Sequence, residues 1–134
     1  MQCEIVGVLS NHPDMHDYVA WHNIPYHHIN MVEANKAAGF SEIAALIEAL
    51  QADVVVLARF MQIVPPELCQ RYFGKMINIH HSFLPAFIGA NPYAKAFSKG
   101  VKLVGATCHY VTEDLDEGPI IEQDVVRIHH GHSE

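Results

Sequence analysis

The sequence has few basic residues and few cysteines, and it has no long apolar run. Its 134 residues carry 8 Lys and Arg against 15 Asp and Glu, which gives a formal net charge of −7. Without a basic cluster the chain lacks the charge that drives binding to DNA or RNA, so nucleic acid is not an expected partner. Uncharged apolar stretches such as Ile5–Leu9 fall far short of the roughly 20 residues that a membrane helix needs, so no membrane partner is expected either.

The three cysteines, Cys3, Cys69 and Cys108, are odd in number and far apart in the chain. Neither a disulfide framework nor a CxxC metal-binding pair can be drawn from them. The first residues carry no basic flank and no apolar segment typical of a secretory signal. These observations predict a protein of the reducing cytoplasm.

Short apolar runs rich in β-branched residues alternate with helical patterns along the chain. Strands are expected at Glu4–Leu9, Pro25–Ile29, Asp53–Ala58, Met76–His80, Lys102–Thr112 and Ile120–Ile128. Helices are expected at Asp14–Trp21, from Ser41 onward, at Pro65–Tyr72 and at Pro92–Ser98. This order predicts the α/β class, with one open, mainly parallel, twisted sheet that has helices on both faces. The last two strands are expected to run antiparallel to each other.

Two details of this prediction depend on local chemistry. Ser41 can cap the helix that follows it, because apolar residues recur after it at helical spacing. Asp53–Ala58 is apolar on both faces, which is typical of a central strand that is covered on both sides. The chain begins with a strand and no helix follows the last strand, so the sheet is expected to be incomplete at both ends.

Polar side chains gather where the expected strands end. Asn78 and His80 are two residues apart in one strand and so point to the same side. His109 lies in a later strand, and Asp116 lies in the turn that follows it. Ligands of open α/β sheets bind at the carboxyl ends of the strands, so these groups are expected to converge there. An amide, an imidazole and a carboxylate suit attack on a carbonyl: they stabilise an oxyanion, move a proton and orient a water.

Spacing alone leaves other interpretations open. An Asn-x-His pair can simply terminate a strand with polar residues. His80, His109 and Asp116 could instead form a metal site with two His and one carboxylate. Ser82 is less favoured as a nucleophile, because no G-x-S-x-G turn surrounds it.

Two longer motifs carry a resemblance to a known family. They are Asn78-Ile-His-His-Ser-Phe-Leu-Pro85 and His109-Tyr-Val-Thr-Glu-Asp-Leu-Asp-Glu-Gly118. In order, they match N-x-H-x-S-x-L-P and H…D-x-D-x-G, and the chain thereby resembles the formyltetrahydrofolate-dependent formyl transferases, most of all the formyltetrahydrofolate deformylases. The resemblance extends over essentially the whole chain, including Cys3–Asn11 and Asp53–Val64.

This resemblance implies a Rossmann-like formyltransferase fold and an enzyme that hydrolyses a formamide C–N bond. Its substrate would be 10-formyltetrahydrofolate, and its products tetrahydrofolate and formate for purine synthesis and one-carbon balance. No metal or cofactor is implied, because the formyl group on N10 is already activated. His81 favours the deformylases, since glycinamide formyltransferases usually carry Pro there. Two alternatives stay open: formyl transfer to an amine, as in the phosphoribosylglycinamide formyltransferases, and an inactive folate-binding fragment.

Residue by residue, the resemblance implies that Asn78, His80 and Asp116 are catalytic. It implies a larger set of substrate-binding residues: Arg59, Phe60, Met61, Gln62, Ile63, Val64, His81, His109, Thr112, Asp114, Glu117 and Gly118. Ordinary core packing is the alternative for Phe60, Met61 and Ile63. Gln62 stands where many relatives carry Arg.

The same resemblance bears on domain organisation. Deformylases of the family carry an N-terminal regulatory domain and a long C-terminal helix, and neither is visible in this sequence. Residues 1–134 are therefore expected to be a single, truncated catalytic domain without the regulatory domain. A sheet without its usual cover exposes apolar surface, so a homo-oligomer is expected.

Overall fold

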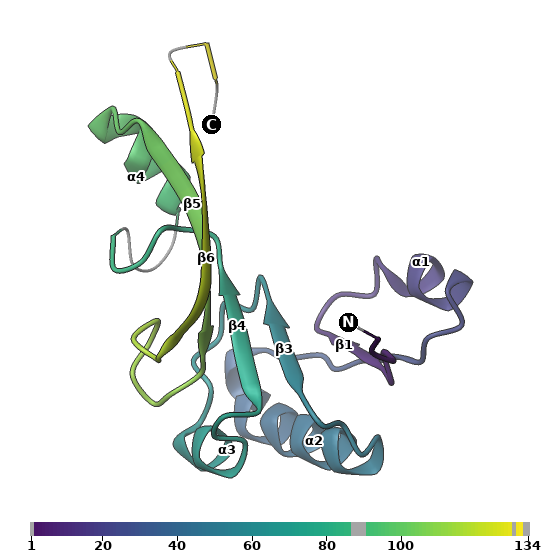
Figure 1. The fold of residues 1–134 in the computed structure, drawn as a ribbon. Helices are drawn as coiled ribbons and strands as arrows, with labels where there is room; N and C mark the ends of the chain where they lie inside the picture. Colours follow the sequence, from purple (N-terminus) through teal and green to yellow (C-terminus); the bar gives the residue numbers. More distant parts are fainter. Residues whose placement is uncertain (1, 87–90, 130, 133–134) are drawn as a thin grey trace. The chain divides into compact units, whose positions relative to one another are not determined.

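The computed structural model describes residues 2–86, 91–129 and 131–132 (Figure 1). The chain divides into two compact units, Met1–Asp53 and Val54–Glu134. No helix in the described part of the chain is long and apolar enough to cross a membrane.

The first unit contains a small parallel sheet and its connecting helices. Strand β1 (Val8–Ser10) pairs with β2 (Tyr26–His28), and α1 (His16–Trp21) lies between them in the sequence. A 3-10 helix, η1 (Glu33–Asn35), leads into α2 (Lys36–Ala49). The buried hydrophobic residues of this unit are Val19, Ile29, Phe40 and Ile47.

The second unit contains a four-stranded sheet in the order β3-β4-β5-β6. Its elements are β3 (Val55–Ala58), α3 (Pro66–Arg71), β4 (Met76–His80), α4 (Pro92–Lys99), β5 (Leu103–Tyr110) and β6 (Ile120–Arg127). Strands β3 and β4 are parallel, β5 is antiparallel to β4, and β6 is antiparallel to β5, with which it forms the long hairpin of Figure 1. The α/β class with an open sheet is confirmed, and so is the antiparallel direction of the last two strands.

The predicted helix boundaries were right where proline marks a helix start or glycine marks a helix end. Helix α3 has Pro66 in its first turn, and α4 ends at Lys99 and is capped by Gly100, whose φ of 64° is the left-handed conformation that glycine adopts readily. The prediction that Ser41 caps a helix was wrong, because α2 already begins at Lys36. The Ser41 hydroxyl instead donates to the carbonyl of Ala37, one turn earlier.

Two strand predictions also differ from the structure. The first strand is Val8–Ser10 rather than Glu4–Leu9, because only these residues pair with β2. In the sheet of the second unit β3 is an edge strand, so the prediction of a central strand was wrong there. Val56 is 53% exposed, which shows that an apolar run does not by itself establish cover on both faces.

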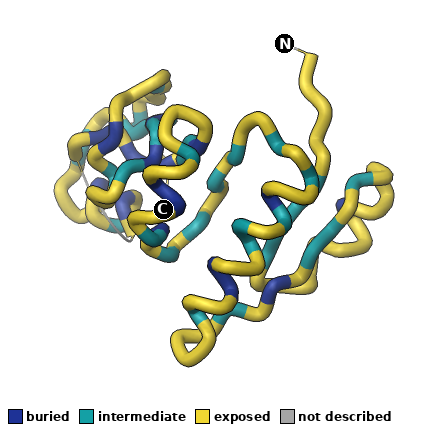
Figure 2. The backbone as a smooth tube through the Cα atoms, turned by 90° about the horizontal axis from the view of Figure 1, so that it is seen from below, coloured by how far each residue is buried: buried dark blue, intermediate teal, exposed yellow. Residues whose placement is uncertain are grey.

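The second unit buries polar side chains as well as apolar ones. Thr107 is fully buried, and His109, Ser82 and His80 are 2%, 3% and 7% exposed. In Figure 2 the buried positions form short segments separated by exposed chain. Burying a polar group costs free energy unless it is hydrogen-bonded, so these four residues need polar partners inside the unit.

Candidate active site

A cavity of about 310 Å³ lies at the carboxyl ends of β3 and β4 in the second unit. Asn78, His80 and Asp116 all line it. Many of the residues for which the resemblance implied substrate binding line it too: Arg59, Phe60, Met61, Gln62, Ile63, Val64, His81, His109, Thr112 and Asp114. Glu117 and Gly118 are not among the lining residues. The volume is at the lower end of the range found for small-molecule sites.

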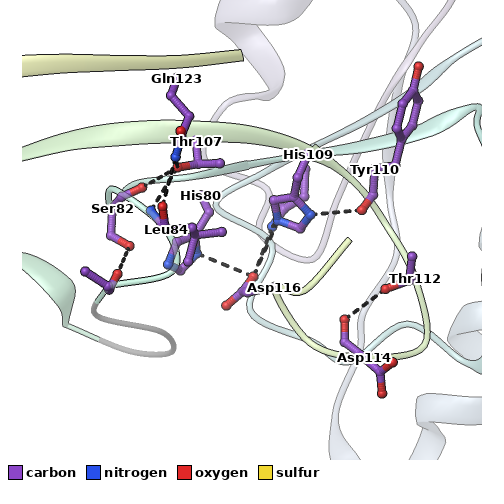
Figure 3. A network of polar contacts seen from close by, with 12 residues as sticks. His80, Ser82, Leu84, Thr107, His109, Tyr110, Thr112, Asp114, Asp116 and Gln123 are labelled. Atoms are coloured by element: carbon purple, nitrogen blue, oxygen red, sulfur yellow. Dashed lines mark hydrogen bonds and ion pairs between the residues drawn. The ribbon is translucent and has the colours of Figure 1, made fainter. Parts of the chain in front are cut away.

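Two of the three residues with the expected chemistry, Asn78 and His80, converge on the carboxylate of the third, Asp116. His80 Nδ1 lies 3.5 Å from Asp116 Oδ1, and Asn78 Nδ2 lies 3.5 Å from the same oxygen. The His80 and Asp116 side chains are only 8% and 6% exposed. Figure 3 shows His80 and His109 on either side of Asp116. The convergence expected from the sequence is therefore present, and the low exposure strengthens the electrostatic interactions within the group.

Gly118 explains how the loop after β5 brings Asp116 to this place. A Cβ atom at Gly118 would lie 1.7 Å from the carbonyl oxygen of Tyr110, so only glycine allows the loop to lie against the end of β5. The loop is closed there by a 2.9 Å hydrogen bond from the Tyr110 amide to the carbonyl of Pro119. Asp116 itself adopts φ 57°, a left-handed conformation that Asp tolerates better than most residues.

His109 reaches the same carboxylate from β5. It is the direct cross-strand partner of Asn78, and the ladder between β5 and β6 is irregular between Cys108 and His109. Such bulges re-aim a side chain next to many active sites. His109 Nε2 lies 3.3 Å from Asn78 Nδ2 and 3.7 Å from Asp116 Oδ1. Its Nδ1 donates to the carbonyl of its neighbour Tyr110 over 2.9 Å.

Helix α3 ties two walls of the cavity together, which the sequence did not suggest. The thiol of Cys69 lies 3.7 Å from the carbonyl oxygen of Val64 and 3.4 Å from that of Thr112. Burial raises the pKa of the Cys69 thiol, and the negative charge of Glu113 raises it further, so the thiol keeps its proton and can donate it. Gln70 donates to the Glu113 carboxylate over 2.7 Å. No local pattern links α3 to residues 43 positions later.

A second polar network holds the segment that follows β4. The Thr107 hydroxyl donates to the carbonyl of Ser82 over 2.9 Å and accepts from the amide of Leu84 over 3.0 Å. Gln123 donates to the Thr107 hydroxyl and to the Leu84 carbonyl, each over 3.0 Å (Figure 3). The Ser82 hydroxyl donates to the carbonyl of Ala86, and Ser82 does not line the cavity. This geometry favours a structural role for Ser82 over that of a nucleophile.

The metal interpretation gains no support from the geometry. Within residues 2–86, 91–129 and 131–132, no group of three His, Cys, Asp or Glu side chains is arranged to hold a metal ion. His80 and His109 instead contact the Asp116 carboxylate through single ring nitrogens, at distances typical of long polar contacts.

Comparison with known proteins now adds to this geometry. The family model described as "Formyl transferase" matches residues 1–134. The chain belongs to the formyl transferase family. Within that family, the formyltetrahydrofolate deformylase of Bacillus subtilis (strain 168) is 51% identical over 130 residues, which are 97% of this chain and 43% of that protein. The chain thus spans less than half the length of this curated relative.

Solved structures of the formyl transferase family show the same fold. A crystal structure of a formyltetrahydrofolate deformylase from Pseudomonas syringae pv. tomato matches with a TM-score of 0.93 and 59% identity, covering 98% of this chain and 44% of that one. A phosphoribosylglycinamide formyltransferase from Bacillus halodurans matches with a TM-score of 0.90 and 35% identity, covering 99% of this chain and 70% of that one. The similarity is therefore higher to this deformylase than to this transferase.

Proposed function

We propose that this chain carries the catalytic site of a formyltetrahydrofolate deformylase, which hydrolyses 10-formyltetrahydrofolate to tetrahydrofolate and formate. The observation that carries the proposal is the convergence of Asn78 and His80 on Asp116 at the cavity. Water adds its oxygen to the formyl carbon, the bond from that carbon to N10 breaks, N10 takes up a proton, and formate leaves with release of one proton. The product formate would serve purine synthesis and one-carbon balance.

Each of the three side chains has a role that its position supports. Asn78 donates an amide N–H to the oxygen that becomes negative when water attacks, and a donor of this kind is worth roughly 10²–10³ in rate. His80, protonated, donates to the same oxygen and passes a proton to N10. Asp116 holds His80 through the Nδ1 contact of 3.5 Å and accepts a proton from the attacking water.

The walls of the cavity supply the proposed folate pocket. The segment Arg59–Val64 forms one wall, and Thr112 and Asp114 belong to another. His81 and His109 complete the lining near the reacting groups. Gly118 is proposed to act on the pocket indirectly, by allowing the loop with Asp116 and Glu117 to close on β5. This hydrolysis needs no metal and no cofactor, because water is the only second reactant and Asn78, His80 and Asp116 supply the groups that donate and accept protons.

Formyl transfer to an amine is the second candidate, because the chain also matches phosphoribosylglycinamide formyltransferases at 35% identity and a TM-score of 0.90. The purified chain is incubated with 10-formyltetrahydrofolate, with and without glycinamide ribonucleotide, and free formate is measured. We expect formate in both reactions at equal rates. Formylated amine in place of formate would support the transferase, and tetrahydrofolate binding without any turnover would support an inactive fragment.

Two wider features are part of the same proposal. Residues 1–134, which the family model matches throughout, would form one catalytic domain that works in the cytoplasm on a small folate, without nucleic acid or membrane partners. Exposed apolar residues such as Phe73, Phe97 and Val126, at 70%, 58% and 59%, support a homo-oligomer. Light scattering across the micromolar range tests this, and a stable monomer at every concentration would contradict it.

A further inference from the structure

His109 is one of the most buried polar side chains in the described part of the chain, at 2% exposure, and both of its ring nitrogens make contacts. We propose that His109 is a positioning residue that sets the direction of the Asn78 side-chain amide. Its ring is held in one tautomer, and that tautomer accepts a hydrogen bond from Asn78. The inference rests on the proposed function, because it concerns the donor that would stabilise the oxyanion.

The tautomer follows from the partner of Nδ1. This nitrogen lies 2.9 Å from the carbonyl oxygen of Tyr110, and a carbonyl oxygen can only accept. Nδ1 must therefore carry a proton. Nε2 lies 3.3 Å from Asn78 Nδ2 and 3.7 Å from Asp116 Oδ1, and the second distance is too long for a hydrogen bond. We assign Nε2 as the acceptor of the nearer contact, in the Nδ1–H tautomer. The position of the Tyr110 carbonyl is itself fixed by two contacts. The Tyr110 amide donates a hydrogen bond to the Pro119 carbonyl, and Gly118 packs against the Tyr110 carbonyl oxygen.

The direction of the Asn78 amide follows from the tautomer. An acceptor at His109 Nε2, 3.3 Å away, requires the NH₂ end of the amide rather than its oxygen. The remaining N–H of that group points toward Asp116 Oδ1, at 3.5 Å, which is the upper limit of a hydrogen bond. A weak partner is readily exchanged, so this N–H is available to an oxyanion in the cavity that Asn78 lines.

Without His109, the long contact to Asp116 would be the only hydrogen bond of the amide among the residues that the structure describes. The two ends of an Asn amide have nearly the same shape, so rotation by 180° would be easy and would present the oxygen to the developing negative charge. An oxygen there repels the charge instead of stabilising it. The loss should therefore fall on kcat, because ground-state binding of the folate does not depend on this group.

The first test compares two variants of His109 whose side-chain amides differ in length. His109→Gln can place an amide oxygen near the position of Nε2 and so keep an acceptor for Asn78, whereas the shorter His109→Asn cannot. We expect His109→Asn to lower kcat for formate release by up to about 10²-fold with KM changed less than about threefold, and His109→Gln to restore most of the loss. Equal losses in the two variants, or a loss confined to KM, would overturn the proposal.

A double-mutant cycle shows whether His109 acts through Asn78. If it does, Asn78→Ala should cost far less in the His109→Asn background than in the original chain. Fully additive losses would mean that His109 acts on something else. Melting curves of all variants establish that the proteins compared are folded.

The tautomer of His109 can also be measured directly on the unmodified chain, whether or not the variants fold. With ¹⁵N-labelled histidine, the ring nitrogen shifts of His109 at neutral pH should show the neutral Nδ1–H tautomer. The Nε2–H tautomer or the imidazolium would overturn the proposal. This readout does not need activity, so a chain that shows the expected tautomer but releases no formate would refute the proposed function and not the placement of Asn78 by His109.

Discussion

Two polar clusters in the second unit are both buried but are held together differently. The loop cluster is Ser82, Leu84, Thr107 and Gln123, and the site cluster is Asn78, His80, His109 and Asp116. Contacts within the loop cluster measure 2.9–3.0 Å and all involve the main chain or the Thr107 hydroxyl. Contacts within the site cluster join side chains and measure 3.3–3.7 Å.

The difference in length has a physical meaning. Short hydrogen bonds to the main chain satisfy buried groups and stabilise the fold. Long contacts between side chains satisfy the same groups incompletely, so their donors and acceptors remain able to bind a substrate or a developing charge. We therefore infer that the loop cluster contributes mainly stability and the site cluster mainly activity.

The largest expected effect comes from Asn78→Ala and Asp116→Ala in the site cluster. Asn78→Ala should lower the rate of formate release roughly 10²–10³-fold, because it removes an oxyanion donor. Asp116→Ala should lower it roughly 10²–10⁴-fold, because it removes the group that accepts the proton of the attacking water. The free energy of unfolding should change by only about 1 kcal/mol, as for most polar substitutions. Steady-state kinetics and urea unfolding of the same preparations check both parts. If both variants unfold before their activity can be compared, the two residues are structural and the comparison between the clusters fails.

The opposite result is expected for Thr107→Val in the loop cluster. Valine has nearly the same shape but removes the acceptor of the Leu84 amide and the hydroxyl that donates to the Ser82 carbonyl. Gln123 loses one of its two acceptors and keeps the Leu84 carbonyl. Each unsatisfied buried group costs about 1–3 kcal/mol. We expect the free energy of unfolding to fall by about 3 kcal/mol, with the activity of the remaining folded protein little changed. Thr107→Ser, which keeps the hydroxyl, is the matched control. An unfolding curve that does not move would show that the cluster does not stabilise this segment.

A smaller effect is expected at His81, which lies in the sequence between His80 of the site cluster and Ser82 of the loop cluster. Its ring centre is 5.6 Å from that of His80 and 5.6 Å from that of Tyr93, and the residue lines the cavity. Proline at this position has no side-chain donor and cannot bind a water, so His81→Pro should lower hydrolysis on the order of tenfold without creating transfer to glycinamide ribonucleotide. An unchanged rate of formate release, with an intact circular dichroism spectrum, would show that His81 takes no part in the chemistry.

The smallest effect is expected at Gln70. This residue does not line the cavity, but it contacts Glu113 in the loop after β5 that also carries Asp116. Gln70→Ala removes the exposed hydrogen bond to Glu113, worth at most about 1 kcal/mol, and should raise KM a few-fold with kcat unchanged. The double variant Gln70→Glu with Glu113→Gln reverses donor and acceptor and should restore KM. A KM that stays at its original value in Gln70→Ala would mean that α3 does not shape the folate pocket.

Much of the architecture could be read from local sequence. Proline at Pro66 and glycine at Gly100 mark a helix start and a helix end because their backbone preferences are intrinsic. The alternation of apolar runs predicted the α/β class, and the two-residue spacing of Asn78 and His80 predicted that both face the same side. These features depend on interactions within a few residues, which local chemistry determines.

The remaining features depend on contacts between distant parts of the chain. Asn78 meets His109 across 31 residues and Asp116 across 38, and Gln70 meets Glu113 across 43. Strand register, the irregular pairing at His109 and the close approach that Gly118 permits bring the site residues together. For the same reason, the edge position of β3 in its sheet could not be read from its apolar residues, since strand order arises from pairing and not from composition.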